Sequence, residues 1–174
     1  MNKLFRVLLI LCLLAPTHVA KAAGLRLRTP VDEITVGNSA TKTVVLITAP
    51  SNQKVRVKAW SVSTDGTDST QSPVTIELMK FTTAGTMTSI TPVKMNQDDG
   101  ETPQSTAAKN ATVEPTGGDV YMNREIPFAN GNFTYIFPFG EEILVKGGER
   151  IGIRVTNSSG SISVNVLPEI IFEE

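Results

Sequence analysis

Short runs of alternating apolar and polar residues constrain this chain more than any other feature. Apolar side chains recur at every second position, and clusters of Gly, Pro, Asn, Asp, Ser and Thr separate the runs. No stretch holds the 3.6-residue period of an amphipathic helix. Successive side chains of a β-strand point to opposite faces, so a strand with one buried face shows this period of two. The pattern therefore predicts an all-β protein.

Many short strands with regular turn signals favour two stacked sheets over one open sheet. Stacking buries one face of each strand and shelters the sheet edges. The fold expected is therefore an antiparallel two-sheet β-sandwich, with jelly-roll topology favoured. The predicted strands are Leu25–Thr29, Glu33–Val36, Thr41–Ala49, Lys54–Thr64, Pro73–Phe81, Pro92–Met95, Ala111–Glu114, Val120–Phe128, Phe133–Phe139, Glu141–Val145, Arg150–Thr156 and Ser161–Phe172.

The apolar parity changes within the predicted strand at 54–64. Val57 and Ala59 share one parity, whereas Trp60 and Val62 occupy the other. One flat strand cannot bury both sets on the same side. We therefore expect either a β-bulge near Ala59 or a strand that leaves one sheet and continues in the other.

The dipeptide Asn130-Gly131 is a strong hairpin signal. A two-residue loop would place Pro127 opposite Thr134 at a hydrogen-bonded position, which proline cannot serve because it has no N–H. We therefore favour a hairpin with the four-residue loop Ala129–Asn132.

An aromatic row follows this predicted turn and is the most obvious candidate for binding. Its members are Phe133, Tyr135, Phe137 and Phe139. Aromatic faces stack on sugars and anchor protein interfaces, but the opposite parity of this strand carries the less aromatic set Thr134, Ile136 and Pro138. We therefore expect the row to face the core, with a subunit interface or a sugar-stacking platform as the alternatives.

The stretch 96–118 is poor in apolar residues and predicts a long loop. Loops longer than about 15 residues are uncommon in compact domains unless they bind something or pack on a neighbour. The stretch is therefore a candidate contact loop; the alternative is a plain connector with one short strand near Val113. The candidate contact residues are Asn96, Asp98, Asp99 and Glu101.

Two acidic stretches raise the possibility of a calcium site. One contains Asp65 and Asp68, and the other is the acidic part of the candidate contact loop. Neither follows the EF-hand pattern. We expect solvated turns here, with no metal and no other cofactor.

The N-terminal segment predicts export. Lys3 and Arg6 precede an apolar run at 7–14, and the small-residue exit Ala20-Lys21-Ala22 follows. The run is about half the roughly 20 residues that cross a bilayer, so a cleaved signal peptide is favoured over an uncleaved tether. The organisation expected is a signal peptide at 1–22 and one β-sandwich domain at 23–174, exported and free of the membrane after cleavage.

Cleavage after residue 22 would remove His18 and Cys12, the single histidine and cysteine of the chain. The processed protein would then have no Ser-His-Asp triad, no cysteine nucleophile and no His- or Cys-ligated zinc. A glycosidase needs only two carboxylates, but nothing in the sequence singles out a pair. We therefore expect a protein that is not an enzyme.

Charge argues against nucleic acid as a partner. The processed chain of 152 residues would keep 13 basic and 17 acidic residues, with the basic ones scattered along the sequence. Nucleic-acid-binding surfaces are instead rich in clustered Lys and Arg. One domain of this length buries roughly 70% of its unfolded surface, so it needs no disulfide.

Seven segments of turn and core residues follow one another within residues 54–174: 55–63, 65–67, 73–78, 82–86, 114–116, 137–155 and Glu173-Glu174. In the last third, a Gly147-Gly148 turn between two apolar strands is similar to the closing hairpin of a single jelly roll, where such a turn joins two strands of one sheet. In these segments and their order, residues 54–174 resemble small uncharacterised structural proteins of tailed bacteriophages and prophages.

This resemblance implies a virion structural protein, such as a head-decoration or fibre-like jelly roll that forms homo-oligomers or coats a larger particle. The signal segment and the predicted strands at 25–49 precede the shared region and are a departure from that group. The alternative function is an exported periplasmic or cell-surface β-sandwich that binds glycan or protein.

Overall fold

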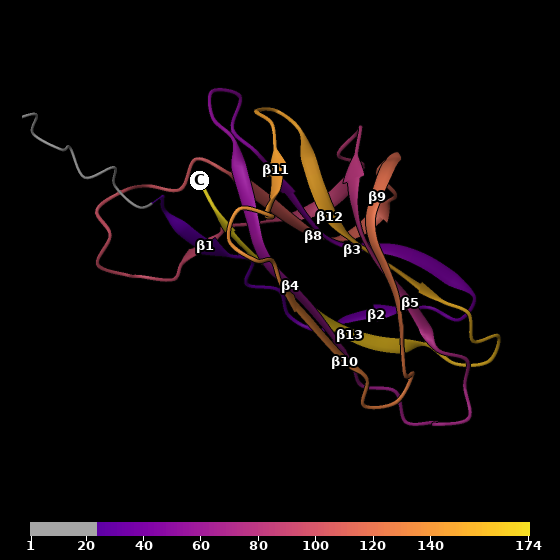
Figure 1. Ribbon diagram of the computed structural model, residues 1–174. Helices are drawn as coiled ribbons and strands as arrows, with labels where there is room; N and C mark the ends of the chain where they lie inside the picture. The colour runs from indigo at the N-terminus through magenta and orange to yellow at the C-terminus, as the bar shows by residue number, and fades with distance from the viewer. Residues whose placement is uncertain (1–23) are drawn as a thin grey trace, which may run out of the picture.

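A computed structural model describes residues 24–174 of the protein, and the predicted signal peptide lies outside these residues. Every regular element of the described residues is a β-strand. The strands form two antiparallel sheets that pack against each other (Figure 1). The predicted all-β sandwich is confirmed.

The first sheet, sheet A, has the strand order β10-β4-β13-β1-β7, and β11 and β2 extend it beside β4 and β13. Its strands are β1 (Arg26–Arg28), β2 (Ile34–Val36), β4 (Val55–Thr64), β7 (Val93–Lys94), β10 (Asn132–Ile136), β11 (Ile143–Val145) and β13 (Val164–Glu173). Sheet B has the order β6-β8-β3-β12-β5-β9. Its strands are β3 (Ala40–Thr48), β5 (Val74–Phe81), β6 (Thr86–Ile90), β8 (Thr106–Val113), β9 (Gly117–Ile126) and β12 (Arg150–Asn157).

The pairing of the strands is that of a jelly roll. The first strands β1 and β2 pair with the last strand β13, and β3 pairs with β12. The inner pairs are β4 with β10 and β5 with β9. Two interlocked four-stranded Greek keys therefore share one core, and the hairpin of β6 and β8 extends sheet B beyond β3.

A β-bulge in β4 explains the change of parity noted at Trp60. In the pairing of β4 with β13, Phe172 lies opposite Val57 and Ile171 lies opposite Ala59, which leaves Lys58 as the extra residue. The bulge returns Trp60 to the core, where 1% of its surface is exposed. The strand stays in one sheet, so the first of the two expected explanations is correct.

The hairpin predicted at Asn130-Gly131 is wrong. Strand β9 pairs with β5 in sheet B, whereas β10 pairs with β4 in sheet A, so the turn joins the two sheets. Thr64 of β4 captures the turn: its N–H donates to the Gly131 carbonyl (2.8 Å), and its hydroxyl accepts from the Gly131 N–H (2.9 Å). The positive φ that this turn requires falls on Asn130 (54°).

The turn at Gly147-Gly148 also joins the two sheets rather than two strands of one sheet. Strand β11 lies in sheet A and β12 in sheet B. Gly148 has the expected positive φ (78°), and its N–H donates to the Ala49 carbonyl (3.1 Å) in the β3–β4 connection. The β3–β4 and β11–β12 connections, which both pass between the sheets, therefore run side by side, as paired connections do in a jelly roll.

The predicted extent of the long loop, residues 96–118, is also wrong. Strand β8 begins at Thr106 and β9 begins at Gly117, so the open loop after β7 ends near Ser105. Strand β8 buries only two small apolar side chains, Ala107 and Ala111, which is why its period of two was weak in the sequence.

The core lies between the sheets, and a smaller apolar cluster lies on the outer face of sheet B. Leu46, Met79 and Phe81 form this outer cluster with Met87. The β5–β6 connection begins directly after Phe81 of this cluster. It is hydrogen-bonded to the β8–β9 connection, since the Thr82 N–H donates to the Thr116 carbonyl (2.9 Å). Part of the outer face of sheet B is therefore already occupied by the protein's own chain.

Candidate functional site

The outer face of sheet A holds the candidate site. Antiparallel register places side chains of four strands, β10, β4, β13 and β1, in rows across this face. In one row Thr134 lies opposite Ser61, and Ser61 lies opposite Glu169. The next row sets Asn132 and Leu167 on either side of Ser63.

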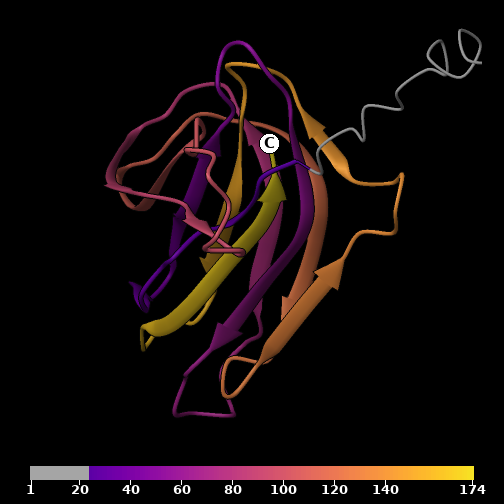
Figure 2. The same ribbon diagram turned by 90° about the vertical axis from the view of Figure 1, so that its left-hand side faces the viewer.

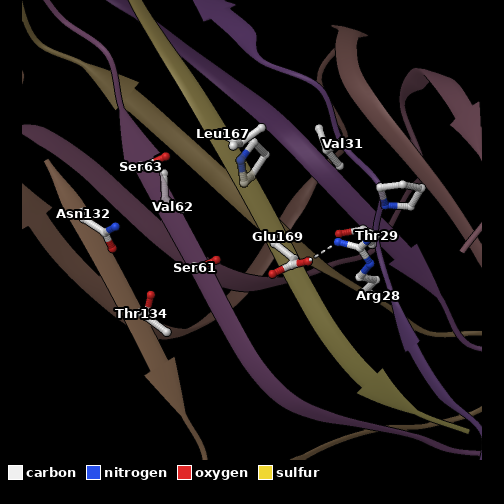
Figure 3. Close-up of a pocket in the computed structure, with 12 residues that line it drawn as sticks. Arg28, Thr29, Val31, Ser61, Val62, Ser63, Asn132, Thr134, Leu167 and Glu169 are labelled. Atoms are coloured by element: carbon white, nitrogen blue, oxygen red, sulfur yellow. Dashed lines mark hydrogen bonds and ion pairs between the residues drawn. The ribbon is translucent and has the colours of Figure 1, made fainter. Parts of the chain in front are cut away.

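These rows line a shallow depression of about 240 Å3. Figure 3 shows Asn132 and Thr134 on one side of it and Arg28 on the other, with Ser61, Ser63 and Glu169 between them. Among the described residues, the side chains of Ser61, Ser63, Asn132 and Thr134 have no protein hydrogen-bond partner. Four neutral polar groups held by a rigid sheet are thus free to bond a ligand.

A charged pair closes the β1 side of the depression. Arg28 Nη1 lies 3.5 Å from Glu169 Oε1, and the Arg28 side chain remains half exposed. Exposed ion pairs of this kind contribute little to stability. Both groups therefore remain available to a carboxylate, a hydroxyl or an amide from outside.

A small apolar dip adjoins the polar depression. Ala59 lies between Ile136 of β10 and Ile171 of β13 in the same cross-strand row. Because the Ala59 side chain is short, the two larger neighbours enclose a hollow of about 100 Å3 with an almost wholly apolar surface. The outer face thus offers a polar surface and an apolar surface side by side.

The predicted aromatic row separates into two environments. Phe133, Tyr135 and Phe137 pack against the core, with the Phe133 ring 4.8 Å from Trp60 and the Tyr135 ring 4.9 Å from Phe137. Phe139 lies on the turn after β10, where 95% of its surface is exposed. Of the four rings, Phe139 is the one free to contact another molecule.

Side chains from β4 fix the turn that carries Phe139. The bulged Lys58 donates from Nζ to Glu142 Oε1 (3.0 Å) and pairs with Glu173 (2.9 Å). Glu142 in turn accepts from the Gly140 N–H through its second carboxylate oxygen (2.8 Å). The bond from Lys58 and the turn N–H groups lower the pKa of Glu142, and the bonds to Glu173 and Glu142 raise the pKa of Lys58.

Most hydrogen bonds of the predicted contact loop are made within the loop or to the Glu174 carboxylate. The Asp98 N–H donates to Asn96 Oδ1 (3.2 Å), and Asn96 Nδ2 donates to Asp99 Oδ1 (3.0 Å). Neither these residues nor Glu101 lines the polar depression. Within residues 24–174 no group of three or more Asp, Glu, His or Cys is placed to hold a metal ion.

Sequence reasoning missed the polar residues of sheet A. Ser61, Ser63 and Thr134 occupy the polar parity of their strands, which is the ordinary pattern of a solvent-facing side. Only the pairing of β4 with both β10 and β13 brings them into one surface. No helix long and apolar enough to cross a bilayer is found in the described part of the chain.

Comparison with known proteins assigns no family to the chain. No protein-family model matches it, and no curated protein is similar to it in sequence. Among solved structures, the chain is similar to the Yersinia pseudotuberculosis-derived mitogen, at 9% identity and a TM-score of 0.37 over 86% of each chain. A likeness this weak carries no argument about function. The phage family expected from the sequence resemblance is not shown by these comparisons.

Proposed function

We propose that this protein is a non-enzymatic structural component that works by associating with copies of itself, as virion decoration and fibre proteins do. The observation that carries the proposal is the exposure of Ile136 (73%) and Phe139 (95%), the two most exposed large apolar side chains among residues 24–174, which lie three residues apart at the β10 edge of sheet A. Ile136, Phe139, Leu144 and Leu167 are four of the eight large apolar side chains exposed among residues 24–174. Exposed apolar groups that gather on one face are typical of interaction surfaces.

The jelly-roll topology supports this proposal because viral capsid proteins use the same architecture to present loops and sheet faces to their neighbours. Fold alone does not assign function, so the argument depends on the surface. The basic, apolar and small-residue pattern at 1–22 supports export of the protein, and a host-encoded or prophage-borne structural protein would combine both features.

Sedimentation velocity over a wide concentration range tests the proposal. We expect the processed chain to form a defined oligomer and to be recovered with purified particles from the producing cells. A chain that stays monomeric and is absent from such particles would contradict the proposal. Intact-mass measurement of the exported product tests cleavage after Ala22.

A second candidate function is glycan binding by the polar depression. The observation that favours it is the set of unpartnered polar groups beside Arg28 and Glu169, since sugars are recognised through several hydroxyl hydrogen bonds. Calorimetric titration of soluble oligosaccharides against the protein checks this function. Thr134→Val should weaken binding, whereas Thr75→Val on sheet B should leave it unchanged.

A further inference from the structure

The turn that carries Phe139 is fixed in place, although its aromatic ring packs on nothing. The Glu141 N–H donates to the Pro138 carbonyl (3.0 Å), and Glu142 holds both Gly140 and Lys58. Gly140 supplies the positive φ (90°) that the turn requires. Figure 2 shows this connection between β10 and β11 projecting beyond the edge of the sandwich.

A fixed and exposed phenylalanine is suited to anchoring an interface. Its ring buries a large apolar area on contact, and few rotamers are lost because the backbone is already ordered. Aromatic anchors of this kind fill pockets on the partner surface. The partner of Phe139 should therefore present an apolar hollow of the size of one ring.

The dip on sheet A has the required apolar character. It measures about 100 Å3. Its lining residues are Ala59, Trp60, Ser61, Thr134, Ile136, Glu169 and Ile171. For comparison, an enclosed apolar cavity of roughly 150 Å3 takes up a benzene molecule. A phenylalanine ring that enters the open dip would cover the exposed side chain of Ile136.

Charges beside the two surfaces are complementary. Glu141, exposed, lies two residues after Phe139 on the turn. Arg28, half exposed, lies opposite Ile171 in the register of β1 and β13, next to the dip. Arg28 also pairs with Glu169, which lines the dip. A second copy of this chain therefore offers the apolar hollow beside an exposed ion pair whose half-exposed arginine can face Glu141.

We propose that two copies associate about a two-fold axis, with Phe139 of each copy seated in the dip of the other and Glu141 facing Arg28. Ile136 lines the dip and precedes Phe139 by three residues, so the same sheet edge carries both the ring and the dip that would accept the partner's ring. Such a self-complementary surface closes into a dimer rather than an open chain. This inference rests on the proposed self-association and names its surface.

Sedimentation equilibrium of Phe139→Ser tests the inference, with Tyr121→Ser on β9 as the matched control. Phe139→Ser removes two seated rings per dimer, so the dimer dissociation constant should rise about 100-fold. Tyr121→Ser, which removes another exposed ring, should leave the constant unchanged. Because Phe139 packs on no other residue, the unfolding transition of Phe139→Ser should match that of the wild type.

A charge exchange provides an independent test. Arg28→Glu and Glu141→Arg should each weaken dimerisation about tenfold, and the double variant should restore it. Glu142→Gln should loosen the turn, with faster hydrogen exchange at the Gly140 amide and a several-fold weaker dimer.

The outcomes separate this inference from the function on which it rests. Wild-type oligomers that survive Phe139→Ser, or a double charge variant as weak as the single ones, overturn the Phe139 interface and leave self-association standing. A wild-type chain that is monomeric at all concentrations overturns both.

Discussion

Thr43 has no exposed surface, yet an irregularity in β3 removes its N–H from the sheet ladder. The register with β12 shifts at this point because Arg154 lies opposite Thr43 and Ile153 lies opposite Val45. Glu114 supplies the missing acceptor: its Oε2 accepts from the Thr43 N–H (2.9 Å) and hydroxyl (2.7 Å). One carboxylate thus satisfies both donors of a buried residue.

Glu114→Ala should lower the free energy of unfolding by about 1–3 kcal/mol, because a buried N–H and hydroxyl would lose their acceptor. Urea unfolding followed by far-UV circular dichroism measures the change. Glu125→Ala, on the exposed edge strand β9, is the control and should change stability little. Equal stabilities of the two variants would show that water replaces Glu114.

Gly152 lies where no side chain fits. A Cβ atom at this position would meet the Val45 carbonyl oxygen at 2.3 Å, and the Leu46 Cα at 3.1 Å. Gly152→Ala should therefore lower the free energy of unfolding by about 1–3 kcal/mol through overpacking. Gly100→Ala is the matched control, since a Cβ there meets nothing within 4 Å. A thermal midpoint unchanged by Gly152→Ala would contradict the close packing of β3 and β12.

At the scale of elements, Glu174 holds the loop that follows β7. Its carboxylate accepts from the N–H groups of Gln104 (2.7 Å) and Ser105 (2.8 Å) and from the Ser105 hydroxyl. Glu174→Ala should leave global stability nearly unchanged, because the loop contributes little to the core, and should speed hydrogen exchange at these two amides.

Hydrogen exchange measured by mass spectrometry on peptides covering residues 95–110 checks this expectation. Glu101→Ala, an exposed carboxylate of the same loop, is the control and should not alter exchange at Gln104 or Ser105. Protection that persists in Glu174→Ala would mean that the loop is ordered by other contacts.

The strands could be predicted where buried apolar residues alternate and could not where they are sparse. Strand β4 was visible as an alternation, and even its bulge was visible as a change of parity at Trp60. Strand β8 was underestimated because alanines supply its buried positions, and a small side chain gives a weak apolar signal.

Pairing was harder to predict than strand formation. The Asn130-Gly131 turn was located correctly, but a turn signal is local and does not state which strands pair on either side. Thr64, 66 residues earlier in the chain than Asn130, holds the turn. The polar depression was missed for the same reason, since its residues come from four strands that only the fold brings together.

At the scale of the whole molecule, ion pairs set the pH range of stability. Bonds to lysine lower the pKa of Glu142, Glu149 and Asp32. As the pH falls below the ordinary carboxyl pKa of about 4, the unfolded chain binds more protons than the folded chain. The stabilisation from these ion pairs is therefore present above that pH and is lost as the pH falls.

The lysine side chains of these ion pairs set the upper pH limit of the stabilisation. Carboxylate partners raise the pKa of Lys58 and Lys80, so their contribution is present below about pH 10.4 and is lost as the pH rises further. No histidine occurs among residues 24–174. Thermal midpoints measured against pH should therefore be nearly flat from about pH 6 to 9 and fall below about pH 4. A steep change near pH 6.5 would contradict this account.

Strand β13 lies in the middle of sheet A, between β4 and the first strands β1 and β2. A growing polypeptide that has not yet released residues 164–173 from the ribosome therefore has its first and fourth strands without the neighbour that joins them. Sheet A therefore cannot close until residues 164–173 have left the ribosome.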